Sequence, residues 1–233
     1  MFIIVDGLDG SGKSTVVKAW NNYLAAAGNG IFDLKNYLKN HDHYPELSEI
    51  KSYDFISSCE PTDTGIGKVI REELIKTGTN YPVQAVADAY ALDRLVLYTK
   101  IIIPLLRDGR CIFQDRGISS SLAYQSVSDS KLTLKKISSL PGNALALRHR
   151  PDYLIIVDTK PKNCLNRLNH RAKKDNVIFE KLNFMTKLEK IYHSRPFLNL
   201  FKKHGTNIIF LNGNVKADIM EAEAIKILKT ILK

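Results

Sequence analysis

Cysteine is scarce in this sequence and follows no disulfide or metal-ligand pattern. Among 233 residues there are three cysteines, Cys59, Cys111 and Cys164, which are widely spaced and form no Cys-x-x-Cys or Cys/His cluster. A disulfide framework and a zinc site are therefore not expected. Isolated cysteines of this kind suit a reducing compartment, so we expect a cytoplasmic protein.

Long apolar segments are missing as well. No apolar run approaches the roughly 18 residues of a membrane-spanning helix, so no membrane partner is expected. Residues 1–5 are apolar, but Asp6 and glycines follow at once, which makes the run too short and wrongly flanked for a signal peptide. Internal repeats and low-complexity segments are absent too, so a repeat architecture is not indicated.

Acidic residues are in the minority. The sequence has 24 Asp and Glu against 34 Lys and Arg, a formal net charge of +10. A positive field favours anionic partners without choosing between a phosphate compound and a polyanion. The basic residues are spread along the chain, densest at 167–174 and near the C-terminus, so no nucleic-acid partner is expected. Ordinary hydrophobic (44%) and charged (25%) contents predict one globular domain over residues 1–233.

Short apolar runs bounded by turn residues alternate with helix-length stretches. The runs predict five buried strands, at residues 2–5, 53–57, 111–113, 153–157 and 207–211. Helices are expected at residues 14–26, 67–76, 83–106, 161–171 and 179–201. This alternation predicts a doubly wound α/β fold, with a parallel five-stranded sheet flanked by helices. Residues 32–52 have no clear periodicity and are expected to form a loop or short-helix insertion.

A phosphate-binding motif follows the first expected strand and opens the first helix. Residues 7–14 match G-x-x-x-x-G-K-[ST]. Glycines let backbone N–H groups surround phosphate oxygens, Lys13 reaches the β- and γ-phosphates, and the Ser14 hydroxyl can ligate Mg²⁺. ATP and Mg²⁺ are therefore the expected cofactors. The expected ATP-binding residues of this segment are Gly7, Leu8, Asp9, Gly10, Ser11, Gly12, Lys13, Ser14 and Thr15.

The phosphate-binding motif alone does not separate a kinase from a switch GTPase or a motor ATPase. A guanine-reading Asn-Lys-x-Asp is absent, which weakens the GTPase interpretation. Three further segments bear on the acceptor: Glu60-Pro61-Thr62 with Arg71 downstream, residues 90–94 on the expected long helix, and Asp115 with Arg116 at the end of the third strand.

The order of these segments resembles the thymidylate kinase family. The resemblance rests on residues 2–15, on the aromatic-x-x-Asp-Arg pattern at 90–94, on the Asp-Arg to Ala-Tyr-Gln stretch at 115–125, on the Pro-Asp strand at 151–158 and on Phe-Glu at 179–180. It covers most of the chain. It implies a P-loop kinase fold with a lid at about 167–180, ATP-dependent phosphorylation of dTMP to dTDP, and a homodimer.

Elementary chemistry supports several acceptor-site residues. A monophosphate acceptor needs cations that hold its phosphate in line with the γ-phosphate, which arginine does bidentately, so Arg71 and Arg116 are the expected clamps. A flat base needs an aromatic platform, which Tyr90 offers at the family's stacking position. Arg94, one helical turn later, can donate to a thymine carbonyl. The alternative for Tyr90 is a core aromatic, and for Arg71 and Arg94 a solvated helix charge.

The resemblance implies further roles. Ser121 would read the base edge, Tyr124 would pack beneath the deoxyribose, and Asp9 would approach the acceptor sugar unless it is an exposed turn residue. Asp115 ends a strand where an α/β sheet places its ligand site, so we expect Mg²⁺ or phosphate-water contact there. Further expected substrate-binding residues are Glu60, Pro61 and Ser120.

Basic residues in the expected lid complete the predicted site. Because the P-loop itself carries no arginine, we expect Arg171 to supply the transition-state cation, while Arg167 resembles the residue that covers the adenine. The alternative is a solvated basic helix end. The expected catalytic residues are thus Lys13, Asp9, Arg116 and Arg171.

Three departures from the family pattern concern the acceptor. Gly117 stands where Tyr or His is usual, Cys59 stands where many members have arginine, and residues 32–52 are longer than the usual link. A deoxynucleoside kinase or a broader deoxynucleotide monophosphate kinase therefore stays open, as does a nucleotide-binding regulator without turnover.

Overall fold

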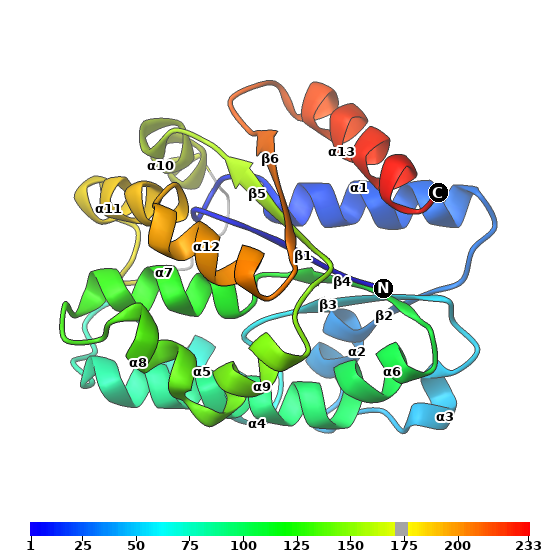
Figure 1. Ribbon diagram of the computed structural model, residues 1–233, viewed down its shortest axis with the longest axis horizontal. Coiled ribbons are helices and arrows are strands. Elements are labelled where there is room, and N and C mark those ends of the chain that lie inside the picture. The colour runs from blue at the N-terminus through cyan, green and yellow to red at the C-terminus, as the bar shows by residue number, and fades with distance from the viewer. Residues whose placement is uncertain (171–176) are drawn as a thin grey trace.

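A parallel sheet forms the centre of the computed structural model, which describes residues 1–170 and 177–233 (Figure 1). In this part of the chain the sheet has six strands in the order β2-β3-β4-β1-β5-β6, and all neighbouring strands are parallel. The predicted doubly wound α/β fold is confirmed. The strands are β1 (Phe2–Gly7), β2 (Ile31–Asp33), β3 (Phe55–Cys59), β4 (Cys111–Asp115), β5 (Tyr153–Asp158) and β6 (Asn207–Asn212).

The described sheet has one strand more than the five predicted. The additional strand, β2, spans three residues and pairs in parallel with β3 at the sheet edge. It overlaps the start of the expected insertion at 32–52, where two short helices follow, α2 (Leu34–Asn40) and α3 (Leu47–Ile50). Three partly exposed residues at an edge show too little alternation to predict a strand.

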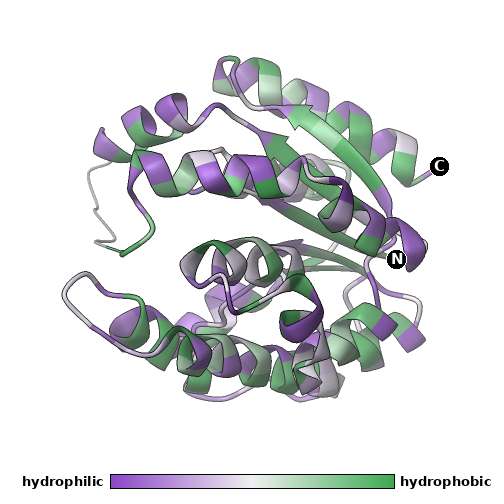
Figure 2. Ribbon diagram, turned by 60° about the vertical axis from the view of Figure 1, so that its left-hand side comes forward, coloured by the Kyte–Doolittle hydropathy of each residue, from purple (hydrophilic) through white to green (hydrophobic). Residues whose placement is uncertain are grey.

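Helices cover both faces of the sheet. On one face α1 (Lys13–Ala26) and α13 (Ala217–Ile231) pack together, and Trp20 donates its indole N–H to the Ala224 carbonyl at 2.8 Å. Figure 2 shows the apolar sides of the helices turned inward. Successive β1 side chains alternate between the two apolar cores, because neighbouring residues of a strand point to opposite faces. Further helices of the described chain are α4 (Gly65–Val69), the π-helical η1 (Ile70–Leu74), α7 (Ile118–Ser128), α8 (Leu134–Ser139), α9 (Pro141–Arg148) and α10 (Pro161–Asn169).

The long helix expected at 83–106 is present but changes its winding. It runs as α5 (Val83–Leu97), a π-helical turn η2 (Tyr98–Ile102) and α6 (Ile103–Arg107). Pro104 has no N–H for the regular hydrogen bond, which explains the wider turn before it.

The helix expected at 179–201 is divided into two. α11 (Leu182–Tyr192) ends before Ser194, whose hydroxyl caps α12 (Arg195–Lys203) by accepting from the Phe197 N–H. Pro196 lies in the first turn of α12, where a missing N–H is tolerated. Across residues 1–170 and 177–233, we find no helix with the length and apolar character needed to cross a membrane.

Candidate active site

The loop between β1 and α1 has the tight backbone that its glycines predict. Gly10 and Gly12 have φ values of 77° and 111°, in the left-handed region that favours glycine. A Cβ at Gly10 would lie 2.6 Å from the Cys164 carbonyl oxygen. The loop closes through a hydrogen bond from the Ser11 N–H to the Leu8 carbonyl at 3.1 Å. Its shape therefore depends on glycine, and α1 begins directly behind it, as phosphate binding requires.

Lys13 lies inside this loop and is almost fully buried. Its Nζ donates to the Leu8 carbonyl oxygen at 2.7 Å. Burial, with a further contribution from the Arg116 charge, lowers the pKa of Lys13 to about 8. The ammonium is thus desolvated before any ligand binds. A phosphate oxygen would replace the hydrogen bonds to water that the ammonium has lost on burial.

Ser14 and Asp115 meet at the carboxyl edge of the sheet, in the first turn of α1 and at the end of β4. The Ser14 hydroxyl donates to Asp115 Oδ2 at 2.6 Å. Asp115 Oδ1 is buried and has no hydrogen-bond partner among the described residues. An unpartnered carboxylate oxygen beside a hydroxyl is a donor set that suits Mg²⁺, which takes few protein ligands and retains water. The two residues therefore fit the expected metal.

Asp9, Arg116 and Tyr124 form one cluster between the P-loop and α7. Arg116 forms an ion pair with Asp9, and the Tyr124 hydroxyl donates to Asp9 Oδ2 at 2.9 Å. Arg116 also donates to the Ser120 hydroxyl at 3.0 Å. Burial opposes its charge, but the neighbouring carboxylates outweigh that effect and raise the pKa of Arg116 well above its usual value. The guanidinium therefore stays charged beside the P-loop.

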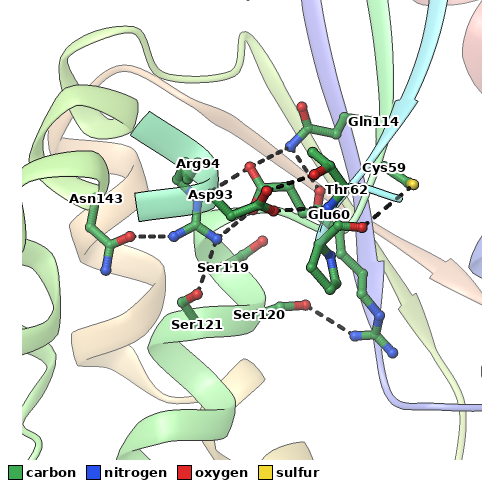
Figure 3. Close-up of polar contacts among 12 residues, drawn as sticks. Cys59, Glu60, Thr62, Asp93, Arg94, Gln114, Ser119, Ser120, Ser121 and Asn143 are labelled. Atoms are coloured by element: carbon green, nitrogen blue, oxygen red, sulfur yellow. Dashed lines mark hydrogen bonds and ion pairs between the residues drawn. The ribbon is translucent and has the colours of Figure 1, made fainter. Parts of the chain in front are cut away.

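Glu60 and Arg94 form a buried ion pair at the other end of the site (Figure 3). Arg94 is 1% exposed and donates to both carboxylate oxygens of Glu60, to Asn143 Oδ1 and, at 3.0 Å, to Ser121 Oγ. These contacts use four of its five N–H groups and leave one on Nη1 for a ligand. Burial raises the pKa of Glu60 to about 7, although the Arg94 charge opposes the rise.

Arg71 is held against the loop that follows β3. Its Nε donates to the Thr62 carbonyl at 3.1 Å and lies 3.4 Å from Asp63 Oδ1. Its Nη2 donates to the Pro61 carbonyl and lies 3.5 Å from the Cys59 sulfur. Among the described residues Nη1 has no such contact, so its two N–H groups are available to a ligand.

One cleft of about 1110 Å³ connects these groups. Its wall includes Lys13 and Asp9 at one end, and Tyr90, Arg94 and Arg71 at the other. Tyr90 is half-buried, and burial raises the pKa of its hydroxyl to about 12, so the side chain stays neutral. The structure thus brings together, in the cleft wall, most residues that the sequence predicted for the site. These are Asp9, Gly10, Lys13, Ser14, Glu60, Pro61, Arg71, Tyr90, Arg94, Asp115, Arg116, Ser120, Ser121 and Tyr124.

Of the basic residues in the expected lid, the structure describes Arg167. Arg167 lies in α10 and donates to the carbonyl oxygens of Ser11, Gly213 and Val215, so it braces the back of the P-loop. Its expected contact with adenine stays a prediction. Arg171 lies outside the described residues, as does most of the expected basic cluster of the lid.

Several structural residues of the site were not predicted. Asp6 accepts hydrogen bonds from Ser120 (2.8 Å) and Tyr192 (3.0 Å), which fixes the start of α7 against β1. Asp93 accepts from the Thr62 N–H at 2.8 Å and so anchors the loop after β3 to α5. Asp93 could have been found from its place beside Arg94. No sequence signal indicated Asn143, which reaches Arg94 from α9.

Parallel strands, a P-loop that opens a helix, and arginines across the cleft define a class of protein. The architecture is that of a P-loop nucleotide kinase.

The comparisons with known proteins identify the family. The sequence profile of the thymidylate kinase family matches residues 46–222. The probable thymidylate kinase of Thermococcus onnurineus (strain NA1) is 33% identical over 179 residues, 74% of this chain and 73% of that protein. That of Pyrobaculum aerophilum is 30% identical over 195 residues, 83% of this chain and 82% of that protein. The chain belongs to the thymidylate kinase family.

Proposed function

We propose that this protein catalyses the ATP-dependent phosphorylation of dTMP to dTDP. The observation that carries the proposal is the single cleft that both parts of the site line. Lys13 of the P-loop lines it, and so do Tyr90 and Arg71, which suit an acceptor nucleotide. Family membership supports the same reaction. A phosphate oxygen of dTMP attacks the γ-phosphorus of ATP, the bond to the β–γ bridging oxygen breaks, and ADP leaves with dTDP as the second product.

The donor end stabilises the transferring group. Lys13 supplies a desolvated positive charge at the β- and γ-phosphates, where negative charge develops during transfer. Arg116 acts on Lys13 electrostatically and forms an ion pair with Asp9 of the P-loop. The proposed role of Arg116 is to hold the acceptor phosphate in line, and that of Asp9 is to approach the sugar.

The acceptor end positions dTMP. Tyr90 offers its ring to the base, and the remaining N–H of Arg94 can donate to a thymine carbonyl. Ser121 and Glu60 fix the Arg94 side chain, while Nη1 of Arg71 faces the phosphate. Each contact is a proposal. Mg²⁺, bound by Ser14 and Asp115, would neutralise phosphate charge and orient the triphosphate.

A coupled ADP-release assay tests the proposal directly. Purified protein is given ATP, Mg²⁺ and each deoxynucleoside monophosphate in turn, and then each deoxynucleoside. Turnover is expected with dTMP, at a higher kcat/KM than with dCMP, dAMP or dGMP. Preference for a deoxynucleoside would make the protein a deoxynucleoside kinase, similar rates with several monophosphates would make it a broader kinase, and ATP binding without turnover would make it a regulator.

We further propose that the protein is a cytoplasmic homodimer. α5 carries Ala85, Ala89, Leu92 and Val96 at helical spacing, and Leu92 is 49% exposed. Such an exposed apolar stripe suits a two-fold interface between identical helices. Light scattering at micromolar concentration should give twice the mass of the chain, and a monomer mass would contradict the proposal.

A further inference from the structure

The insertion at 32–52 forms part of the cleft wall. Lys35 and Lys39, four residues apart on α2, both line the cleft that contains Lys13 and Arg71. This placement follows from the unpredicted strand β2. Because β2 pairs in parallel with β3, the chain enters α2 at the same sheet edge from which the loop with Pro61 departs.

The charges of Arg71 and Lys35 both act on the thiol of Cys59. Arg71 Nη2 lies 3.5 Å from the Cys59 sulfur. Burial raises the pKa of this thiol to about 12, and the charges that oppose the rise are those of Arg71 and then Lys35. The thiol is therefore neutral at pH 7 and balances neither cation. Asp63, whose Oδ1 lies 3.4 Å from Arg71 Nε, balances the Arg71 charge.

Lys35 has no such carboxylate partner within the described residues. Its side chain is exposed, and within residues 1–170 and 177–233 it makes no hydrogen bond or ion pair. Lys39, also exposed in the cleft wall, is likewise without a hydrogen bond or ion pair among the described residues, whereas two other cations of the wall have carboxylate partners. Arg116 pairs with Asp9, and Lys68 lies 3.8 Å from Asp42. A monophosphate ester brings a charge of about −1.5 to −2 near pH 7. The two proposed clamps, Arg71 and Arg116, each already face a carboxylate, Asp63 and Asp9.

We propose that Lys35 binds the acceptor phosphate together with Arg71, its ammonium donating to a phosphate oxygen. The assignment rests on the proposed function and adds a binding residue to it. It also accounts for Cys59, which stands where many family members have arginine. The positive charge missing at this position would come instead from Lys35 in α2, the helix that follows the neighbouring strand β2. Lys39 lies one turn further along α2, and its charge is not among the main ones acting on the thiol.

The test separates recognition of the phosphate from recognition of the nucleoside. Lys35→Gln removes the charge, Lys35→Arg keeps it, and Lys51→Gln is the matched control, since Lys51 is an exposed lysine of the same insertion. KM values for dTMP and ATP are measured by ADP release, and dissociation constants of dTMP and thymidine by calorimetry. Lys35→Gln should raise the KM for dTMP by about tenfold, the loss of one hydrogen bond to a charged group. Its thymidine affinity and KM for ATP should equal those of Lys51→Gln, and Lys35→Arg should keep most of the dTMP affinity.

Two results would overturn the assignment alone: equal KM values for dTMP in Lys35→Gln and Lys51→Gln, or an equal loss of dTMP and thymidine affinity. Absence of turnover of dTMP by the unmodified protein would overturn the proposed function and the assignment together. Circular dichroism of each variant confirms that the exposed substitutions leave the fold intact.

Discussion

The donor end and the acceptor end of the cleft are built in opposite ways. At the proposed donor end, residues 7–14 are contiguous, and their backbone would form the phosphate-binding surface. At the proposed acceptor end, Arg71, Tyr90, Arg94 and Ser121 come from three helices, η1, α5 and α7, and line the cleft with their side chains. A backbone site tolerates few substitutions but needs little support, whereas a side-chain site depends on supporting residues such as Asn143.

The largest effect is expected at the donor end. Lys13→Ala should lower kcat by about 10³-fold or more, because its charge acts mainly in the transition state. ADP release at saturating substrates measures the loss. Lys18→Ala, on the exposed side of the same helix, is the control and should keep full activity. Activity of the Lys13 variant within about tenfold of the parent would refute this role of the P-loop.

At the acceptor end, breaking the buried ion pair between Arg94 and Glu60 should lower the stability of the fold. Arg94→Met leaves the Glu60 carboxylate buried without its partner, so the free energy of unfolding should fall by about 3–5 kcal/mol. Urea denaturation measures it. Adding Glu60→Gln to this variant removes the unpaired charge and should restore part of the loss. If the double variant is no more stable than Arg94→Met, the ion pair is not what stabilises this region.

A smaller effect is expected for the base platform. Tyr90→Ala should raise the KM for dTMP by about 10- to 100-fold, the equivalent of roughly 1–3 kcal/mol of stacking. The KM for ATP should hardly change, because Tyr90 lies at the acceptor end. A raised KM for ATP with an unchanged KM for dTMP would contradict the proposal that Tyr90 stacks on the base of dTMP.

The smallest effect comes from pH. In the free protein the Lys13 ammonium loses its proton as pH rises through about 8, the value to which burial lowers its pKa. The charged form is the active one, so kcat/KM for ATP should fall above that pH, approaching about tenfold per pH unit. With ATP saturating, kcat/KM for dTMP should stay level over the same range above pH 8, since Glu60, with a pKa raised to about 7, is then ionised and the Tyr90 pKa is raised to about 12. A level ATP profile up to about pH 9.5 would contradict the shifted lysine.

The predictions from sequence succeeded where a signal is local. The strands at β1, β3, β4, β5 and β6 were expected, because buried parallel strands appear as short apolar runs. The edge strand β2 was missed since its three residues are only partly buried. The winding change before Pro104 and the break at Ser194 were missed too, because apolar periodicity continues through both.

By itself, the sequence determined the phosphate loop, since its glycines and Lys13 act within a single turn of chain where backbone geometry follows from residue type. It also indicated Tyr90 and Arg94 as one unit, because residues four apart share a helix face. Only the tertiary structure decided that Arg94 pairs with Glu60 and Asn143, and that Lys35 reaches the cleft. These contacts depend on strand order and helix packing, which bring distant segments together through burial of apolar surface. The local sequence around the residues that meet therefore gives no signal of the contact.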